Sequence, residues 1–529
     1  MANSHAERWR AALRGSRFRT LTLIGLAVAG LSAVAGPSSP LAAQESPADR
    51  LEIGEHVFPN GLRLLVLERP GDPRVESKIF TRFGALVEEP GELGSAHFLE
   101  HLMFKGTEML GTTDWAAERP IRERIDATEL ALIEALNRSR NDLRERGVFH
   151  DFKRAESTPE IDSLRAEIQA LEREASAFRD NGSMMRWYQA FGGTGLTATT
   201  EQEYMKFDIN LPRERVELFL RVEADRMSST VFREFDQERM ILVEQRYGDL
   251  NRPTTPFYEA LDATVGSVHP VYWNEGYETD FYQYTRSYQR DLYERYFVPN
   301  NTTLVFVGGV SLEEMIPLVD RYFGAMERRP EPMREKAVQP LPEAERRMVW
   351  RSNDLAPRVD VRHRIPGIGH PDRPAFDVLA ELLADEIRGE LAAAGVSGRV
   401  NVNTRVVHTT RFGVPATLNA EVVVGAAAVD RAEAAVLNAM DDLSRSAVDP
   451  ARLQHAKKRL RAAWYRSAAD AGSLAFDIGH FATMDRWTTL VEHLRARDAV
   501  SAEDVTRLAS RYFVPENRTT GVVRPEAEQ

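Results

Sequence analysis

The chain has 529 residues, of which 43% are hydrophobic and 28% are charged. This composition is typical of a folded protein, and the length exceeds what one hydrophobic core usually organises. The net charge of -12 argues against nucleic-acid binding, because phosphate recognition requires a basic surface. The sequence contains no cysteine, which excludes disulfides and thiolate ligands, so a metal ion would be held by His, Asp or Glu.

The first 43 residues have the order of a secretory signal. Five arginines between Arg8 and Arg19 precede an uncharged apolar run from Leu21 to Gly36. Small residues that follow allow cleavage after Ala35 or near Ala43, and the apolar run is short for a bilayer span. We predict a signal peptide at residues 1–43 and an exported protein, periplasmic or extracellular, with an uncleaved membrane anchor as the alternative.

The segment after the signal begins with strand patterns and then changes to a helix. Asn-Gly at 60–61 is a hairpin turn signal that leads into residues 62–67, and a second extended run covers 78–86. Proline and glycine then break the pattern. Ser95 is the predicted cap of a helix that begins just before His97.

Residues 119–180 have the pattern of two amphipathic helices. Apolar residues recur there at spacings of three and four, which places them on one helical face. An antiparallel helical hairpin is the simplest interpretation, and we predict an insertion at 119–185. The two seams are Ile121, Ile125, Thr128, Leu132 and Leu136, then Ile161, Leu164, Ile168, Leu171, Ala175 and Phe178.

Two distant segments have nearly the same sequence. Tyr-Phe-Val-Pro-Asn-Asn-Thr-Thr begins at Tyr296, and Tyr-Phe-Val-Pro-Glu-Asn-Arg-Thr begins at Tyr512. Each follows a helical, arginine-rich stretch and enters a β-type run, so the same helix–turn–strand unit occurs twice. We predict two homologous α+β halves at 50–325 and 346–525, joined by a charged, proline-rich linker at 326–345.

His97, Glu100 and His101 form the most informative motif. Positions i, i+3 and i+4 lie on one face of a helix, so the two imidazoles can bind one ion beside the carboxylate. Zinc bound in this way acidifies a water molecule, whose proton a nearby carboxylate can accept. The His-x-x-Glu-His order is the reverse of the commoner zinc-protease motif and uses the same geometry. The alternative is a helix with two surface histidines.

Residues 55–320 resemble the catalytic half of the pitrilysin/insulinase-type (inverzincin) zinc metallopeptidases, especially bacterial exported members. The resemblance rests on three motifs, and the second half resembles the non-catalytic domain of that family. It implies two halves that form a clamshell, each an antiparallel sheet with packed helices. It also implies Zn²⁺-dependent hydrolysis of unfolded peptides, with Glu100 as the base that activates a zinc-bound water. The motifs are Gly-Ser-Ala-His-Phe-Leu-Glu-His-Leu-Met-Phe-Lys-Gly-Thr from Gly94, Gly-Thr-Gly-Leu-Thr-Ala-Thr-Thr from Gly193, and Val-Phe-Arg-Glu-Phe-Asp-Gln-Glu-Arg-Met-Ile-Leu-Val-Glu-Gln-Arg from Val231.

The resemblance also implies a third zinc ligand, the second glutamate of a Glu-x6-Glu pair on a later helix. Aligned without gaps, the pair falls on Glu238 and Gln245. A shift of one residue makes Glu244 the ligand and places Gln237 in the upstream position. We predict Glu244 as the third ligand, with Glu238 or Gln245 as the alternative ligand or as a residue that orients the ligands.

Two further positions depart from the family pattern. Thr197-Ala198 replaces the usual Asn-Ala of the edge strand that binds substrate. A substrate peptide is expected to add a strand beside 195–207. The second half also lacks a clear version of the Arg/Tyr pair that holds the substrate carbonyl in active members.

Three functions follow from these patterns. The first is an active zinc endopeptidase. The second is a non-catalytic subunit that binds peptide or partner with a degraded metal site beside an active paralogue, and the third is a metal-free peptide-binding or structural envelope protein. The expected partners are peptide or unfolded protein, no nucleic acid, and a homodimer or a heterodimer with a related peptidase subunit.

Overall fold

The computed structural model describes residues 51–148, 157–266, 276–332, 340, 343–405 and 416–526. The chain divides into two units, residues 1–45 and residues 46–529. The predicted signal peptide lies outside the described residues and stays a prediction. Among the residues that are described, none of the helices is both long and apolar enough to cross a membrane.

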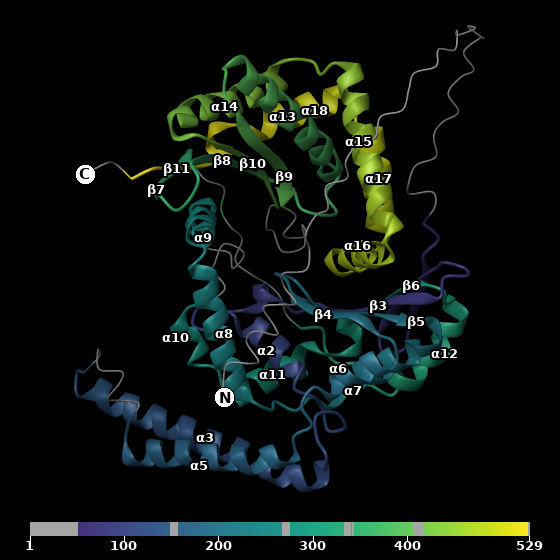
Figure 1. The fold of residues 1–529 in the computed structure, drawn as a ribbon, viewed down its shortest axis with the longest axis vertical. Helices are drawn as coiled ribbons and strands as arrows, with labels where there is room; N and C mark the ends of the chain where they lie inside the picture. Colours follow the sequence, from purple (N-terminus) through teal and green to yellow (C-terminus); the bar gives the residue numbers. More distant parts are fainter. Residues whose placement is uncertain are drawn as a thin grey trace, which may run out of the picture. The chain divides into compact units, whose positions relative to one another are not determined.

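The first half, from β1 to α12, is built on a six-stranded sheet with the order β1-β2-β6-β3-β5-β4 (Figure 1). The β2–β6 pair is parallel, and the other neighbouring pairs are antiparallel. The predicted turn joins β1 to β2, and Gly61 there has a φ of +88°. The strands are β1 (Gly54–Val57), β2 (Arg63–Glu68), β3 (Arg74–Thr81), β4 (Thr194–Thr200), β5 (Met205–Pro212) and β6 (Thr302–Gly308).

Two expected strand boundaries differ in the structure. The run predicted at 78–86 is strand only to Thr81, after which the chain turns into a short 3-10 helix, η2 (Ala85–Val87). The stretch predicted as one edge strand at 195–207 contains the end of β4, a turn and the start of β5. The turn forms because the N–H of Glu201 donates to the carbonyl of Tyr204 at 2.8 Å.

Helices cover one face of the first sheet and form its larger core. Successive residues of a strand point to opposite faces, so Leu64 and Phe306 join this core while Leu65 and Val307 face the other way. The helices of the first half outside the insertion are α2 (Ser95–Met103), α6 (Ser183–Ala190), α7 (Val216–Ser229), α8 (Phe235–Leu250), α9 (Thr254–Val265), α10 (Glu278–Phe281), α11 (Arg286–Tyr296) and α12 (Leu312–Phe323).

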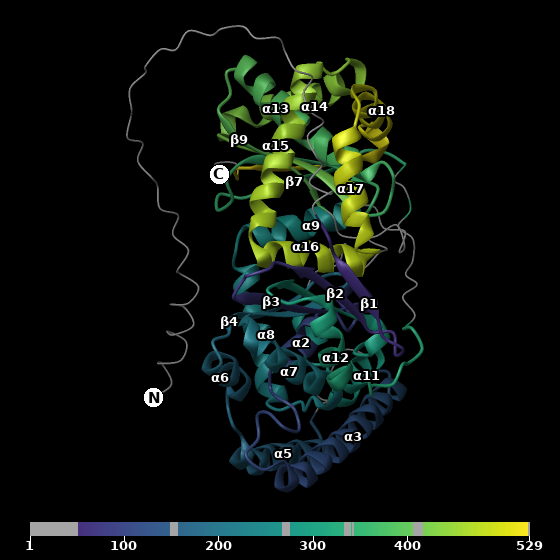
Figure 2. The same ribbon diagram turned by 90° about the vertical axis from the view of Figure 1, so that its right-hand side faces the viewer.

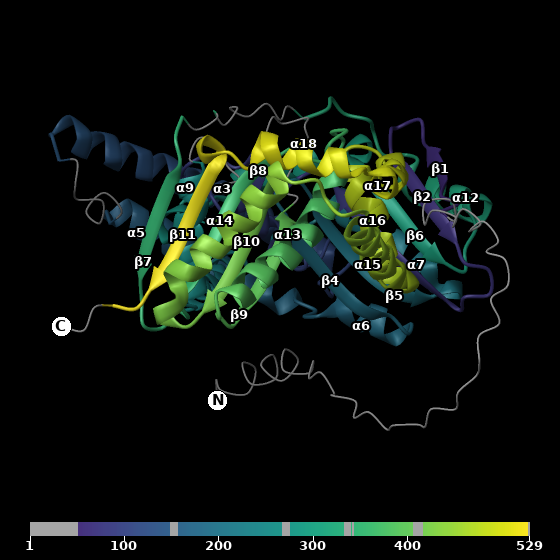
Figure 3. The ribbon, with the colours of Figure 1, turned by 90° about the horizontal axis from the view of Figure 1, so that it is seen from above.

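The second half, from β7 to β11, repeats this strand order with one strand fewer. Its sheet has the order β7-β11-β8-β10-β9, with β7 parallel to β11 (Figure 3). In their order across the sheet these strands correspond to β2, β6, β3, β5 and β4 of the first sheet. The strands are β7 (Arg346–Arg351), β8 (Arg358–Ile365), β9 (Gly398–Arg405), β10 (Ala416–Val424) and β11 (Arg518–Arg524), and the helices are α13 (Arg373–Ala393), α14 (Val429–Arg445), α15 (Pro450–Ala469), α16 (Ala471–Met484), α17 (Thr488–Ala499) and α18 (Ala502–Tyr512).

The repeated Tyr-Phe-Val-Pro segments make the same contacts in both halves. The side-chain amide of Asn301 donates to the carbonyl of Tyr296 at 2.7 Å and to that of Arg82 at 3.3 Å. Asn517 donates to Tyr512 and Arg364, both at 2.9 Å. In each half one asparagine therefore ties the end of a helix to the end of the neighbouring strand. The predicted fold class of two homologous α+β halves is confirmed.

Each half contributes one helix to the other half's sheet. Helix α16 packs on β3 and β6, on the face that the first-half helices leave free (Figure 2). Helix α9 packs in the same way on β7 and β11. A glycine lies at each contact and permits the close approach. A Cβ at Gly479 of α16 would overlap the ring of Phe80, and a Cβ at Gly521 of β11 would come 2.8 Å from Leu261 of α9.

The insertion is a helical hairpin of α3 (Trp115–Glu145) and α5 (Pro159–Ala175), which lie side by side (Figure 1). Five of the predicted seam residues form its buried core. Two contacts tie the hairpin to the first half. Glu118 of α3 accepts a buried, charge-assisted hydrogen bond from Arg233 at 2.8 Å, and the backbone N–H of Arg286 donates to the partly buried Glu129 at 2.9 Å. The five core residues are Ile121, Ile125, Ile168, Leu171 and Ala175.

Candidate active site

Helix α2 carries the His-x-x-Glu-His motif and begins differently from the prediction. Its N-cap is Gly94, with a left-handed φ of +86°, and Ser95 is the first helical residue. The carboxylate of Glu88 accepts the backbone N–H groups of Gly94 at 2.9 Å and of Ala96 at 2.8 Å. This carboxylate is only 3% exposed and lies where the helix dipole favours negative charge. The predicted Ser95 cap is wrong because a distant carboxylate already satisfies these donors.

His97 and His101 lie next to each other on α2. Their ring centroids are 4.9 Å apart. Burial and the neighbouring His101 lower the pKa of His97 to about 4, so this imidazole is neutral at pH 7, as a metal ligand must be. The two imidazoles thus lie side by side on one helix, and their binding of one ion stays a prediction.

Glu238 of α8 holds the outer side of His101. Its Oε2 lies 3.0 Å from Nδ1 of His101, and its Oε1 lies 2.5 Å from Nζ of Lys105. Burial opposes ionisation of Glu238, but the hydrogen bonds from His101 and Lys105 outweigh it and lower the pKa of the carboxyl. An ionised carboxylate at Nδ1 fixes the proton on that nitrogen, which leaves Nε2 free to bind a metal ion.

The start of α8 sets this contact. Glu234 precedes α8 with φ of +56°, the one positive φ of a non-glycine residue in the described ranges. Such a conformation costs on the order of 1 kcal/mol for a residue with a Cβ. Ion pairs with Lys105 at 3.2 Å and Arg179 at 2.6 Å hold Glu234 there. One helical turn later, Glu238 faces His101.

The two residues that compete for the third ligand position lie farther along α8. Seven residues make about two helical turns, so Gln245 lies on the same face as Glu238, whereas Glu244 is turned roughly 120° away from it. Both side chains are exposed. In the described part of the chain neither forms a hydrogen bond or ion pair with His97 or His101.

Glu100 faces a cavity of about 500 Å³. Burial raises the pKa of its carboxyl, and a hydrogen bond donated by Thr200 Oγ1 at 2.6 Å opposes that rise. Thr200 ends β4, which is the edge strand of the sheet, and Ala198 of the same strand lines the cavity. Thr197 is exposed on β4. The histidine motif and the predicted substrate strand therefore meet at one cavity.

The residues present fit zinc through two ligands. The imidazoles of His97 and His101, the carboxylate behind His101 and the nearby Glu100 are the donor set of a zinc hydrolase. A third protein ligand is not in place: the described residues contain one group of three His, Asp or Glu side chains with ligand atoms within 4.8 Å of one another, and that group lies elsewhere.

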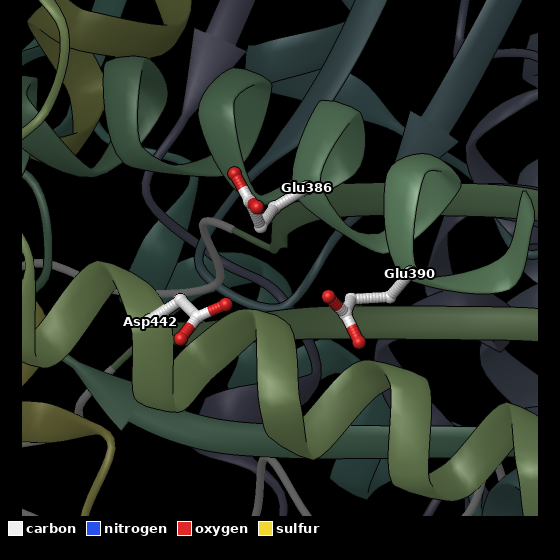
Figure 4. A group of neighbouring side chains, drawn as sticks. All are labelled: Glu386, Glu390 and Asp442. Carbon is white, nitrogen blue, oxygen red and sulfur yellow. The ribbon is translucent and has the colours of Figure 1, made fainter. Parts of the chain in front are cut away.

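That other group consists of Glu386 and Glu390 of α13 and Asp442 of α14 (Figure 4). Two of its three carboxylates already have protein partners. Glu386 pairs with Arg452, and Glu390 accepts from Asn438 at 3.3 Å. Partly exposed acidic groups of this kind are common without an ion, and this one contains no imidazole.

Sequence reasoning missed three groups at the site. Glu88 lies too far from α2 for any capping pattern, and the bond from Thr200 to Glu100 depends on sheet pairing. His480 lines the cavity from α16 of the second half, next to Tyr204. No local spacing marks any of them, although the predicted edge strand did place Thr200 near the substrate.

Residues 63–116 match the family described as "Insulinase (Peptidase family M16)", and residues 284–460 match the "Peptidase M16 inactive domain". The chain is also 20% identical over 365 residues to the zinc protease PqqE of Helicobacter pylori. The aligned segment covers 65% of this chain and 79% of that protein. Both matches are to models of the insulinase family, which the chain therefore resembles.

Two solved structures share the fold of this chain. A protease from Helicobacter pylori superposes with a TM-score of 0.70 at 16% identity, covering 90% of this chain and all of that one (100%). The periplasmic protease PqqL from Escherichia coli superposes with a TM-score of 0.65 at 13% identity, covering 91% of this chain and 48% of that one. At these identities the likeness establishes the fold alone.

Proposed function

We propose that the protein is a zinc-dependent endopeptidase that cleaves unfolded peptides. The observation that carries this proposal is the meeting of His97, Glu100 and the edge strand β4 at one cavity. A peptide that adds to β4 as a further strand would pass beside the Glu100 carboxylate. A folded domain could not present its backbone in this way.

Each residue would have a defined part in the reaction. His97 and His101 would hold zinc through their ring nitrogens, with Glu238 orienting His101. Bound zinc would supply a Lewis acid and an acidified water. The raised pKa of Glu100 suits a group that accepts a proton from the attacking water and passes it to the leaving amine. Thr200 would hold this carboxylate in place.

We place the third ligand position at Gln245 rather than at Glu244. The contact between Glu238 and His101 fixes which face of α8 is turned toward α2, and Gln245 shares that face. A neutral amide oxygen is a weaker zinc ligand than a carboxylate and compensates less of the ion's charge. The proposed site is therefore a weakened one.

This weakness favours the second function, a non-catalytic subunit that binds peptide beside an active paralogue. Two observations support it: an amide, Gln245, stands at the proposed ligand position, and the carboxylate of Glu244 is exposed on another face of α8. It keeps the same cavity and edge strand but does not require a loaded metal site. A homodimer or a heterodimer with a related subunit would belong to this function.

The Glu100→Gln variant tests the proposed activity. Turnover of an unstructured peptide should fall by at least about 100-fold, because general acid–base catalysis contributes that much, while zinc content stays unchanged. Glu244→Gln is the matched control, since it makes the same chemical change on the exposed face of α8 and should alter neither quantity. Equal turnover by wild-type and Glu100→Gln protein would refute the mechanism, and loss of zinc from Glu244→Gln would restore Glu244 as the ligand.

The Gln245→Glu variant tests the weakened position. We expect zinc affinity, measured by competition with a chelating dye, to rise at least about tenfold, because a carboxylate replaces an amide beside two imidazoles. An unchanged affinity would show that Gln245 does not face the metal.

We also propose that the protein acts outside the cytoplasm. The signal-like first 43 residues and the similarity to a periplasmic protease support this. Mass spectrometry of the N-terminus of protein recovered from the cell envelope tests it. An intact Met1 on all of that protein would contradict export by cleavage of a signal peptide.

A further inference from the structure

The cavity beside Glu100 has a second wall that comes from the other half of the chain. His480 and Met484 of α16 line it together with residues of α2 and β4. They are separated by four residues, so they lie on one face of α16. Helix α16 packs closely on the first sheet, because its Gly479 lies directly against the ring of Phe80.

The imidazole of His480 is held by Tyr204. The phenol oxygen lies 3.1 Å from Nδ1 of His480, and the two rings meet edge to face at 5.7 Å. Tyr204 is only 1% exposed, so its hydroxyl proton needs an acceptor. Nδ1 is the one acceptor the described residues offer it. The phenol therefore donates to Nδ1.

This hydrogen bond determines which ring nitrogen of His480 carries the proton. Burial lowers the pKa of His480 to about 4, so the ring is neutral and has a single N–H. With Nδ1 accepting from Tyr204, that N–H is at Nε2. No described residue accepts a hydrogen bond from Nε2, and the side chain is only half-buried. A fixed donor is thus available to whatever occupies the cavity.

Most other side-chain groups at the cavity are acceptors or are already engaged. The Glu88 carboxylate caps α2, and Glu100 accepts from Thr200. A peptide lying along β4 presents backbone carbonyl groups, which need donors. His480 of α16 supplies such a donor in the same cavity.

We propose that His480 binds the substrate, donating a hydrogen bond from Nε2 to a backbone carbonyl of a peptide in this cavity, with Tyr204 as the residue that positions it. The inference rests on the proposed function, because it takes an extended peptide as the occupant. It makes the second half a direct contributor to peptide binding.

Binding without turnover is the appropriate measurement. The full mature protein carrying Glu100→Gln is titrated into a fluorescein-labelled unstructured peptide, and Kd is read from anisotropy. Adding His480→Ala should raise Kd about five- to tenfold, the equivalent of one lost hydrogen bond. His480→Gln, which keeps an N–H donor, should recover part of this loss. Tyr204→Phe keeps the ring but frees the tautomer, and should raise Kd about twofold.

Two controls separate binding from folding and from metal binding. His455→Ala removes an exposed histidine of α15 and should leave Kd unchanged. Zinc content and the far-UV circular dichroism spectrum should be the same in all variants. An unchanged Kd in His480→Ala would overturn the inference. Loss of zinc in that variant would also overturn it, because His480 would then be a metal ligand.

The proposed activity and this inference can fail separately. If the wild-type protein cleaves nothing but binds peptide with a Kd that depends on His480, the inference stands and the endopeptidase proposal falls. If the protein cleaves peptide and His480→Ala changes neither Kd nor KM, the reverse holds. Absence of any peptide binding would overturn both.

Discussion

Helix α16 should be highly sensitive to a single methyl group at Gly479. This glycine lies in the middle of α16, against the ring of Phe80. A Cβ built at Gly479 would overlap three ring atoms of Phe80, and the farthest of them would be only 2.6 Å away. Phe80 is 1% exposed on a central strand and also packs against Tyr204, so its ring has little room to move.

The expected size of the effect follows from two opposing terms. Replacing glycine by alanine within a helix stabilises it by about 1 kcal/mol. Overpacking a buried site costs about 1–3 kcal/mol and sometimes more, and three overlapping atoms place Gly479→Ala at the upper end. We expect a net loss of about 1–2 kcal/mol. Gly389→Ala is the matched control, because Gly389 is an exposed helical glycine of α13 with no atom within 4 Å of an added Cβ. It should stabilise the protein by about 0.5–1 kcal/mol.

Urea unfolding followed by circular dichroism gives the sign for each variant, and hydrogen exchange of the α16 segment shows where the change lies. Phe80→Leu adds a test of the specific contact. Combined with Gly479→Ala it should cost less than the sum of the single changes, by about 1 kcal/mol or more, because the smaller side chain makes room. If Gly479→Ala is as stable as the wild type and α16 exchanges no faster, α16 does not pack on Phe80.

Three further outcomes follow from the fold. Asn301→Asp and Asn517→Asp should each lower the free energy of unfolding by about 1–3 kcal/mol, because an aspartate cannot donate to the two carbonyls that each amide binds; a neutral effect at either site would argue against the shared helix-to-strand tie. Glu88→Ala should expose two unsatisfied N–H groups at the start of α2 and speed hydrogen exchange there, with Glu88→Gln intermediate, and equal exchange in all three proteins would rule out this cap. Burial raises the pKa of Asp477 to about 6, so the folded state binds the proton more tightly than the unfolded state, and stability falls as pH rises from about 4 to 6. Asp477→Asn should remove this loss, which is worth on the order of 2–3 kcal/mol above pH 6. Parallel profiles of stability against pH for the variant and the wild type would contradict this prediction.

The sequence predicts those parts of the fold that depend on local periodicity. The seam of the α3–α5 hairpin, the Gly61 turn and the repeated Tyr-Phe-Val-Pro units all follow from spacing within a few residues, and the structure contains each. The exchange of α9 and α16 between halves could not be predicted, because it depends on which sheet face is left uncovered. In the structure, the close approach of Gly479 to Phe80 and of Gly521 to Leu261 marks the two places where the halves exchange these helices.

The candidate site divides in the same way. His97, Glu100 and His101 share one helical face, so their spacing alone brings them together. Glu88 caps α2 from outside any local pattern, and His480 comes from the other half. For the third ligand the sequence left two alignments open. The contact of Glu238 with His101 favours one of them, because it fixes the rotation of α8 about its axis.

The two unusual features of the site act on different free energies. Gln245 would weaken zinc binding, whereas His480 and β4 would act on peptide binding, which does not need the metal. Occupancy of a weak metal site depends on the ratio of free zinc to its Kd, so a tenfold weaker site needs tenfold more free zinc for the same loading. The endopeptidase and the non-catalytic subunit would then differ in zinc loading rather than in fold. If this is right, wild-type turnover should rise with added zinc and saturate at a higher zinc concentration than turnover by Gln245→Glu. Such a result would show that zinc loading decides between the two functions. Turnover that is independent of added zinc in both proteins would show that the amide at 245 costs the site nothing.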